Sequence, residues 1–212
     1  MTAILLGQEY TRERKLRGVS IDLLSVLDYT SSIGLNTLLC KNNTWPEFKN
    51  SVLSLPLTDK LFFYYSGHKV NNYFEFPHHY VEEKELFALL ESRLSPSQSY
   101  LDSPSQLYPR GQCVMLIDTC YGLFSLPHHP QIDYVVFVSS TTTTPAISSV
   151  WGSLFTRSWL TTLRDISNKE DSLSSSKSSP TITWPEVVSS LEYPAPFSYS
   201  FSTPKIWPWL RT

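Results

Sequence analysis

Two reactive side chains follow two strongly apolar runs of this sequence. Residues 114–117 (VMLI) lead within three positions to Cys120, and residues 61–65 (LFFYY) lead within three positions to His68. Short apolar runs of this kind are typical of strands buried on both faces, as in a parallel sheet. Because ligands and chemistry collect at the carboxyl ends of such strands, we expect the two side chains to meet at one sheet edge. A thiol beside an imidazole is a nucleophile with its base.

The elements that would position these groups alternate along the chain. Short apolar runs predict strands, and apolar residues repeating every three or four positions predict amphipathic helices. Strands that alternate with helices indicate an α/β fold with a mostly parallel central sheet covered on both faces. We expect strands at 2–7, 36–40, 61–65, 114–117 and 134–138, with a small excursion at 73–76 and a last strand near Ile206. We expect helices at 16–27, 44–55, 81–94, 153–163 and 183–191.

A four-residue signature, TWPE, occurs twice in the chain, at 44–47 and at 183–186. Threonine caps a helix, proline suits the first turn, and glutamate three residues on reaches back to the cap. Both segments therefore predict the beginning of a helix.

Size and composition restrict the class of protein. With 212 residues, 41% of them hydrophobic, the chain is long enough for one domain with a proper core, 1–212. A net charge of −2 and the lack of a basic cluster argue against nucleic acid as a partner. No apolar run approaches the length of a membrane span. Three cysteines do not suggest a disulfide framework, so we expect a reducing compartment and a cytoplasmic location.

Four motifs, in order, resemble those of the caspase-like cysteine peptidases, most closely of the metacaspase and paracaspase branches. They lie at 3–7 with 15–22, at 63–68 (FYYSGH), at 116–120 (LIDTC), and at 138–140 with 152–156 (GSLFT). The resemblance covers residues 3–163 and implies a caspase-like three-layer sandwich with about six strands. Beyond this core we expect a flexible serine-rich loop at 164–182 and a last helix with a proline-rich tail at 183–212.

The resemblance implies a role for each reactive group. Cys120 would be the nucleophile and His68 the general base, and in the caspases the histidine lies about 50 residues before the cysteine. Here the cysteine lies 52 positions after the histidine. The backbone N–H groups of Cys120 and Lys69 would bind the oxyanion. No cofactor and no metal are expected.

The primary specificity follows from charge. Caspases that cut after aspartate carry glutamine two places before the cysteine, where this chain has Asp118. Asp22 matches the second pocket carboxylate of metacaspases and paracaspases, and the resemblance also assigns Ser139 to substrate binding. Two carboxylates in a poorly solvated pocket favour a guanidinium or ammonium group. We therefore predict a peptide or protein substrate cleaved after arginine or lysine.

The sequence departs from the family at two places that matter. The glycine after the histidine is replaced by Lys69, which we expect to restrict the backbone at an oxyanion position. The acidic loop that binds calcium in many metacaspases has no counterpart between His68 and Val81, so calcium dependence is not expected.

Other interpretations stay open. Cys120 could be a small core residue, and Asp118 could cap a turn. The histidine pairs at 78–79 and 128–129 lack the spacing of a zinc site. A caspase-like pseudoenzyme could keep the dyad without turnover and act as a decoy or scaffold in a cell-death or immune signalling pathway. A flavodoxin-like nucleotide binder would need a glycine-rich phosphate loop, which the chain lacks. A homodimer is possible.

Overall fold

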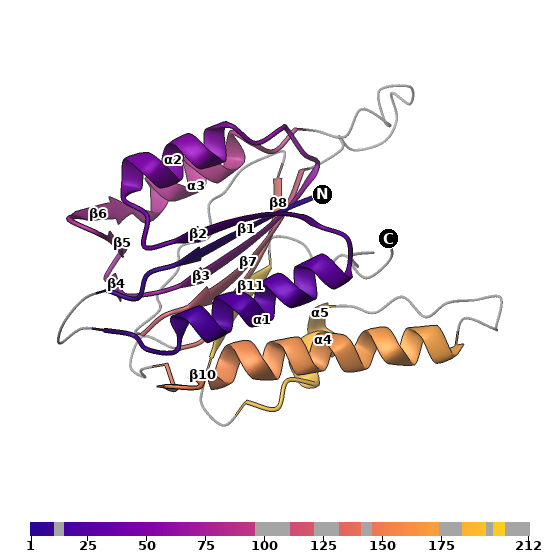
Figure 1. Cartoon of the computed structure of the whole chain (residues 1–212). Helices are drawn as coiled ribbons and strands as arrows, with labels where there is room; N and C mark the ends of the chain where they lie inside the picture. Colours follow the sequence, from indigo (N-terminus) through magenta and orange to yellow (C-terminus); the bar gives the residue numbers. More distant parts are fainter. Residues whose placement is uncertain are drawn as a thin grey trace, which may run out of the picture.

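A six-stranded sheet forms the centre of the chain, with strand order β11-β8-β7-β3-β1-β2 (Figure 1). Five strands are parallel, and β11 pairs antiparallel with β8 at one edge. The computed structural model describes residues 1–10, 15–95, 111–120, 132–140, 146–173, 184–193 and 197–201. The strands are β1 (Thr2–Gly7), β2 (Asn36–Lys41), β3 (Lys60–Ser66), β7 (Gly111–Asp118), β8 (Ile132–Val138) and β11 (Ser198–Phe201).

Helices cover both faces of this sheet (Figure 1). One face carries α1 (Val19–Ser32), α4 (Leu154–Leu173) and α5 (Trp184–Ser189), and the other carries α2 (Trp45–Leu53) and α3 (Glu83–Glu91). The three layers and the mostly parallel sheet confirm the α/β architecture predicted from the sequence.

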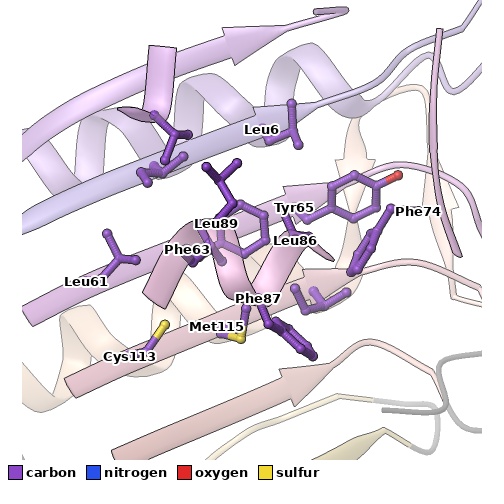
Figure 2. Close-up of a cluster of buried hydrophobic side chains, with 14 of the residues drawn as sticks. Leu6, Leu61, Phe63, Tyr65, Phe74, Leu86, Phe87, Leu89, Cys113 and Met115 are labelled. Atoms are coloured by element: carbon purple, nitrogen blue, oxygen red, sulfur yellow. The ribbon is translucent and has the colours of Figure 1, made fainter. Parts of the chain in front are cut away.

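Alternate residues of each strand enter different cores, because successive side chains point to opposite faces of a sheet. Phe63, Tyr65 and Met115 pack beneath α2 and α3. Figure 2 shows them beside Leu86, Phe87 and Leu89 of α3. Tyr64 and Leu116, one position along each strand, pack against α1 and α4 instead. Both cores are fully apolar over most of the strand length, which explains why the strands appear in the sequence as uninterrupted apolar runs.

A three-stranded antiparallel sheet follows β3, with order β4-β5-β6. Its strands are β4 (Lys69–Val70), β5 (Tyr73–Phe76) and β6 (His79–Glu82). The excursion predicted at 73–76 is therefore a complete small sheet, and the helix predicted from 81 begins at Glu83, because residues 79–82 pair with β5. A two-stranded hairpin, β9 (Ser148–Ser149) and β10 (Gly152–Ser153), precedes α4.

The predicted end of α4 was wrong. The helix continues to Leu173, whereas a flexible loop was expected from 164. Two contacts explain the extension: Ile166 is buried one turn after Leu163, and Arg164 forms an ion pair with Asp28 of α1 at 3.0 Å. The rest of the expected loop, from 174, lies outside the described residues. So does Ile206, where the last strand was expected, while β11 lies earlier, at Ser198–Phe201.

The first TWPE signature forms the predicted capping box. The backbone N–H and the hydroxyl of Thr44 both lie 2.8 Å from a carboxylate oxygen of Glu47. The second signature coincides with the beginning of α5 at Trp184. Local capping chemistry was thus a reliable guide to where these helices begin.

Candidate active site

Strands β3 and β7 end at the same level of the sheet. Ser66 pairs with Asp118, the last residues of the two strands, and the Gly67 N–H donates to the Asp118 carbonyl at 3.2 Å. His68 and Cys120 each follow two residues later, so both leave the carboxyl edge of the sheet from neighbouring strands. Both residues are half-buried. The parallel register thus brings a thiol and an imidazole to one edge while leaving each open to solvent.

The three cysteines differ in exposure. Cys40 and Cys113 are buried in the core beneath α2 and α3, and burial raises the pKa of the Cys40 thiol to about 11. Burial also raises the pKa of Cys113. Thiols kept protonated in a core are inert, since the thiolate is the nucleophile. Cys120 is therefore the cysteine with the access that chemistry requires.

Tyr10 holds the segment that carries the histidine. Its hydroxyl accepts a hydrogen bond from the His68 N–H and donates one to the Glu75 carbonyl, both at 2.9 Å. Its ring lies against the imidazole, with centroids 4.6 Å apart and planes tilted by 30°. Tyr10 adopts a φ of +58°, which is uncommon for an aromatic residue and is maintained by these contacts.

Gly67 allows this close packing. A Cβ at that position would lie 2.5 Å from the Tyr65 hydroxyl and 3.1 Å from the Tyr10 hydroxyl. The Tyr65 hydroxyl in turn donates to the His68 carbonyl at 2.7 Å. Two tyrosines and a glycine thus fix the backbone on either side of the imidazole.

Lys69 directs its side chain away from solvent. Its Nζ lies 2.6 Å from a carboxylate oxygen of Glu83, and the lysine side chain is fully buried. Nζ also donates to the Asn71 carbonyl at 2.5 Å. The lysine that replaces the family's glycine is therefore part of a buried ion pair between β4 and the first turn of α3, and its side chain does not occupy the edge where Cys120 emerges.

The backbone of Lys69 tolerates a side chain. Lys69 is not among the described non-glycine residues with positive φ. The lysine therefore occupies the position of the family's glycine without backbone strain. Lys69 pairs with Phe74 across β4 and β5. In the neighbouring pair, His68 and Glu75, the Glu75 N–H donates to the His68 carbonyl at 3.1 Å. Because bonded and non-bonded pairs alternate in an antiparallel ladder, the Lys69 N–H points away from β5.

Two carboxylates are buried together behind this edge. Asp118 ends β7 on the face covered by α1 and α4, and Asp22 lies in the first turn of α1; their exposed fractions are 5% and 4%. The Thr156 hydroxyl donates to Asp118 Oδ2, and the Ser153 N–H donates to Asp22 Oδ1, both at 2.8 Å. The β9–β10 hairpin can lie this close to Asp22 only with a glycine at position 152. A Cβ on Gly152, whose φ is +99°, would lie 2.4 Å from Asp22 Oδ1.

The acid pair resists ionisation. Burial, and next the charge of Asp118, raise the pKa of Asp22 to about 7, while the Ser153 N–H and the charge of Arg157 act in the opposite direction. Burial also raises the pKa of Asp118, opposed by the hydroxyl groups of Ser153 and Thr156. Two like charges in a poorly solvated place cannot both be stable without a cation nearby. The arrangement is therefore complementary to a positively charged group.

Ser139 is fully buried and anchors the turn that precedes the cysteine. Its hydroxyl accepts from the Thr119 N–H at 3.0 Å and donates to the Thr119 carbonyl at 3.1 Å. The Ser140 hydroxyl donates to the same carbonyl at 2.6 Å. These contacts fix the residue before Cys120, and a direct role of Ser139 in substrate binding stays a prediction.

Sequence reasoning missed three residues of this site. Tyr10 gave no signal beyond an aromatic residue shortly after the first strand. Thr156 lay within a recognised motif but received no role, and Glu83 looked like one charge among many on a surface helix. Each acts across more than 10 residues of sequence, which no local pattern records.

The described parts of the chain show neither a cluster of metal-binding side chains nor a membrane-spanning helix. No group of three or more His, Cys, Asp or Glu side chains there could hold a metal ion. None of the helices described combines the length and the apolar character needed to cross a bilayer. Of the histidine pairs, 128–129 lies outside the described residues.

Comparison with known proteins bears on the fold. No family model matches the chain, and no curated protein sequence matches it. Among solved structures, the chain is similar to the crystal structure of caspase-1 from Spodoptera frugiperda, with a TM-score of 0.57 and 12% sequence identity. The match covers 77% of this chain and 70% of that one. At this identity the likeness shows the fold, and it confirms the caspase-like sandwich.

Proposed function

We propose that the chain is a cysteine endopeptidase that cleaves peptide bonds after arginine or lysine. The observation that supports this most is the β3–β7 register, which brings His68 and Cys120 to the same edge of the sheet. The caspase-like fold supports a peptidase in general. On the cysteine usage we also propose a cytoplasmic protein, and on the two pocket acids we propose a place near the metacaspase and paracaspase branches.

In the proposed reaction, His68 takes the thiol proton and the Cys120 sulfur attacks the carbonyl carbon of the scissile bond. The oxygen gains the negative charge and accepts hydrogen bonds from the backbone N–H groups of Cys120 and Lys69. The C–N bond then breaks, and His68 gives its proton to the leaving amine. Water attacks the thioester with His68 again as base, which releases the carboxylate product and restores the thiol.

The acid pair supplies the proposed specificity. A substrate arginine or lysine beside Asp22 and Asp118 would add a second cation to the charge of Arg157, which already favours the ionised form of Asp22. Because the pKa of Asp22 is raised to about 7, this carboxyl is protonated in a fraction of the molecules at neutral pH. A bound cation would favour its ionised form, so KM for arginine substrates is expected to fall as the pH rises through 7.

One observation favours the alternative, a caspase-like pseudoenzyme that works as a decoy or scaffold. Both carboxylates are nearly fully buried and already hydrogen-bonded, Asp118 to Thr156 and Asp22 to the Ser153 N–H. A pocket closed in this way would bind no substrate side chain unless the hairpin before α4 moved.

Turnover of fluorogenic peptides that end in arginine, lysine or aspartate separates the two. The peptidase is expected to cleave the arginine and lysine peptides and to ignore aspartate, and Cys120→Ala should abolish cleavage. In Asp118→Ala, kcat/KM for the arginine peptide should fall on the order of 100-fold, since a close charge pair is lost. Efficient cleavage after aspartate would contradict the specificity, and no turnover of any peptide would favour the pseudoenzyme.

A further inference from the structure

The small sheet β4-β5-β6 has one buried face and one open face. Phe74, Phe76 and Val81 enter the core beneath α2 and α3, and Figure 2 shows Phe74 beside Tyr65. The ring centroids of Phe74 and Tyr65 lie 4.8 Å apart. These contacts fix which face of the small sheet is turned inward.

The open face carries exposed apolar side chains. Val70, Tyr73 and Tyr80 are 46%, 40% and 52% exposed. Val70 pairs with Tyr73 across β4 and β5, and Tyr80 pairs with Glu75 across β5 and β6. Paired residues share a face, and residues two apart on a strand do so as well. The three apolar side chains therefore lie together.

Two acidic residues complete this face. Glu75 lies between the aromatic residues and is half-buried, with one carboxylate oxygen buried. Glu82 pairs with Tyr73, whose hydroxyl donates to it at 3.2 Å. Lys84 forms an ion pair with Glu82 at 2.5 Å. We call the set Val70, Tyr73, Glu75, Tyr80 and Glu82 the β4–β6 platform.

The platform continues from His68. The Glu75 N–H donates to the His68 carbonyl at 3.1 Å, which extends the β4–β5 ladder by one pair and places His68 opposite Glu75. The imidazole is thus on the same face as the exposed aromatic residues. On the other face, the neighbouring residue Lys69 is buried against Glu83, as the alternation of side chains requires.

We propose that the β4–β6 platform binds the part of the peptide substrate that follows the scissile bond and selects apolar or aromatic side chains there. This inference rests on the proposed peptidase function. The group that protonates the leaving amine must lie beside the first residue after the scissile bond, so the chain beyond it leaves from His68. The sheet face that carries His68 is the surface next to it.

The chemistry of the platform defines what it binds. Rigid aromatic rings offer large contact area at little cost in conformational entropy, and exposed apolar groups gathered on one face are typical of interaction sites. Glu75 disfavours acidic side chains on the same surface, whereas the charge of Glu82 is offset by Lys84. The occupant is therefore an extended segment with apolar or aromatic residues, not an acidic one.

Two substrates with the same residues up to the arginine test the proposal. One ends in a coumarin amide and has no residues after the scissile bond, and the other is a quenched peptide with four further residues, two of them phenylalanine. In Tyr80→Ala and Tyr73→Ala, kcat/KM is expected to fall about tenfold for the extended peptide and to stay unchanged for the coumarin amide. Leu57→Ala, an apolar residue that is 61% exposed and precedes the opposite end of β3, is the control and should change neither.

A binding measurement keeps the test independent of turnover. Fluorescence anisotropy of the labelled extended peptide with Cys120→Ala should show an affinity that Tyr80→Ala weakens about tenfold and that aspartate in place of the two phenylalanines abolishes. An equal fall in kcat/KM for both substrates, or an affinity that neither tyrosine variant changes, would contradict the proposal that the platform binds the substrate. Absence of all cleavage, with the tyrosine-dependent affinity retained, would refute the peptidase function and leave the platform as a peptide-binding surface.

Discussion

Two buried pairs of ionisable side chains near the carboxyl edge of the sheet differ in the sign of their charges. Lys69 and Glu83 are opposite charges in direct contact, 2.6 Å apart, with both side chains almost fully buried. Asp22 and Asp118 are two acids, equally buried, that are satisfied by a backbone N–H and a hydroxyl. The first pair neutralises itself, whereas burial raises the pKa of both acids of the second pair, and the charge of Asp118 raises that of Asp22 further.

Under the proposed function, this difference separates a structural role from a functional one. A neutral ion pair can hold β4 against α3 and needs nothing else. Two buried acids destabilise each other when ionised, so the fold gains nothing from the second charge, and a cation supplied from outside would bind tightly.

The largest effect is expected from removing the lysine of the opposite-charge pair. In Lys69→Met the charge of Glu83 stays buried without its partner, so the free energy of unfolding should fall by about 3–5 kcal/mol. Urea denaturation measures this. The double variant Lys69→Met with Glu83→Leu should recover most of the loss, because no charge is left buried. A loss below about 1 kcal/mol in the single variant would mean that the pair is not buried as described.

Removing a charge from the acid pair should raise the free energy of unfolding, in contrast to Lys69→Met. Asn at position 22 can still accept from the Ser153 N–H, but it carries no charge, so Asp22→Asn should stabilise the fold at pH 8 by on the order of 2 kcal/mol. The native protein binds this proton up to pH about 7, whereas the unfolded chain loses it near the ordinary value of 3.8. The stability that the protonated acid provides is therefore lost as the pH rises from about 4 through 7.

The pH dependence of unfolding measures this gain. The advantage of Asp22→Asn should be small at pH 4 and grow toward pH 8. Asp28→Asn on the same helix is the matched control, since its carboxylate is exposed and meets Arg164 at the surface. It should change stability by less than about 1 kcal/mol. A loss of stability in Asp22→Asn at pH 8 would show that the acid serves the fold.

The smallest effect is expected at Tyr10, outside both pairs. Tyr10→Phe keeps the ring against His68 but loses the hydroxyl that accepts from the His68 N–H and donates to the Glu75 carbonyl. We expect kcat to fall about fivefold to tenfold with KM unchanged, because the base is less well placed. In Tyr10→Leu, which also loses the ring contact, kcat should fall further. A change in KM alone would show that Tyr10 contacts the substrate instead.

Much of the scaffold was predictable because its signals are local. The apolar runs ending near Ser66 and Asp118 indicated two buried parallel strands, and the capping box at Thr44 marked the beginning of α2. Helix ends were harder to predict. Residues 164–173 look polar in sequence, and the helix continues there because Ile166 and Arg164 find partners on other elements.

The residues of the site likewise divide into those that the sequence predicted and those that it did not. The positions of His68 and Cys120 at strand ends followed from the strand pattern, and the two acids followed from the family resemblance. The roles of Tyr10, Thr156 and Glu83 depend on side chains that meet across the fold, and the sequence shows no period or spacing that joins them. The burial of Lys69 could not be predicted either, since β4 is too short to show an alternating pattern.

The central claim is that the Cys120 thiol and a cation-binding acid pair belong to one site, and the rate of covalent labelling tests it directly. Peptidyl chloromethyl ketones that end in arginine or in aspartate would be compared by mass spectrometry of the Cys120 peptide. The arginine reagent is expected to label Cys120 at least about 100-fold faster, and Asp118→Asn should remove that preference. Equal rates for the two reagents, or faster labelling by the aspartate reagent, would contradict it.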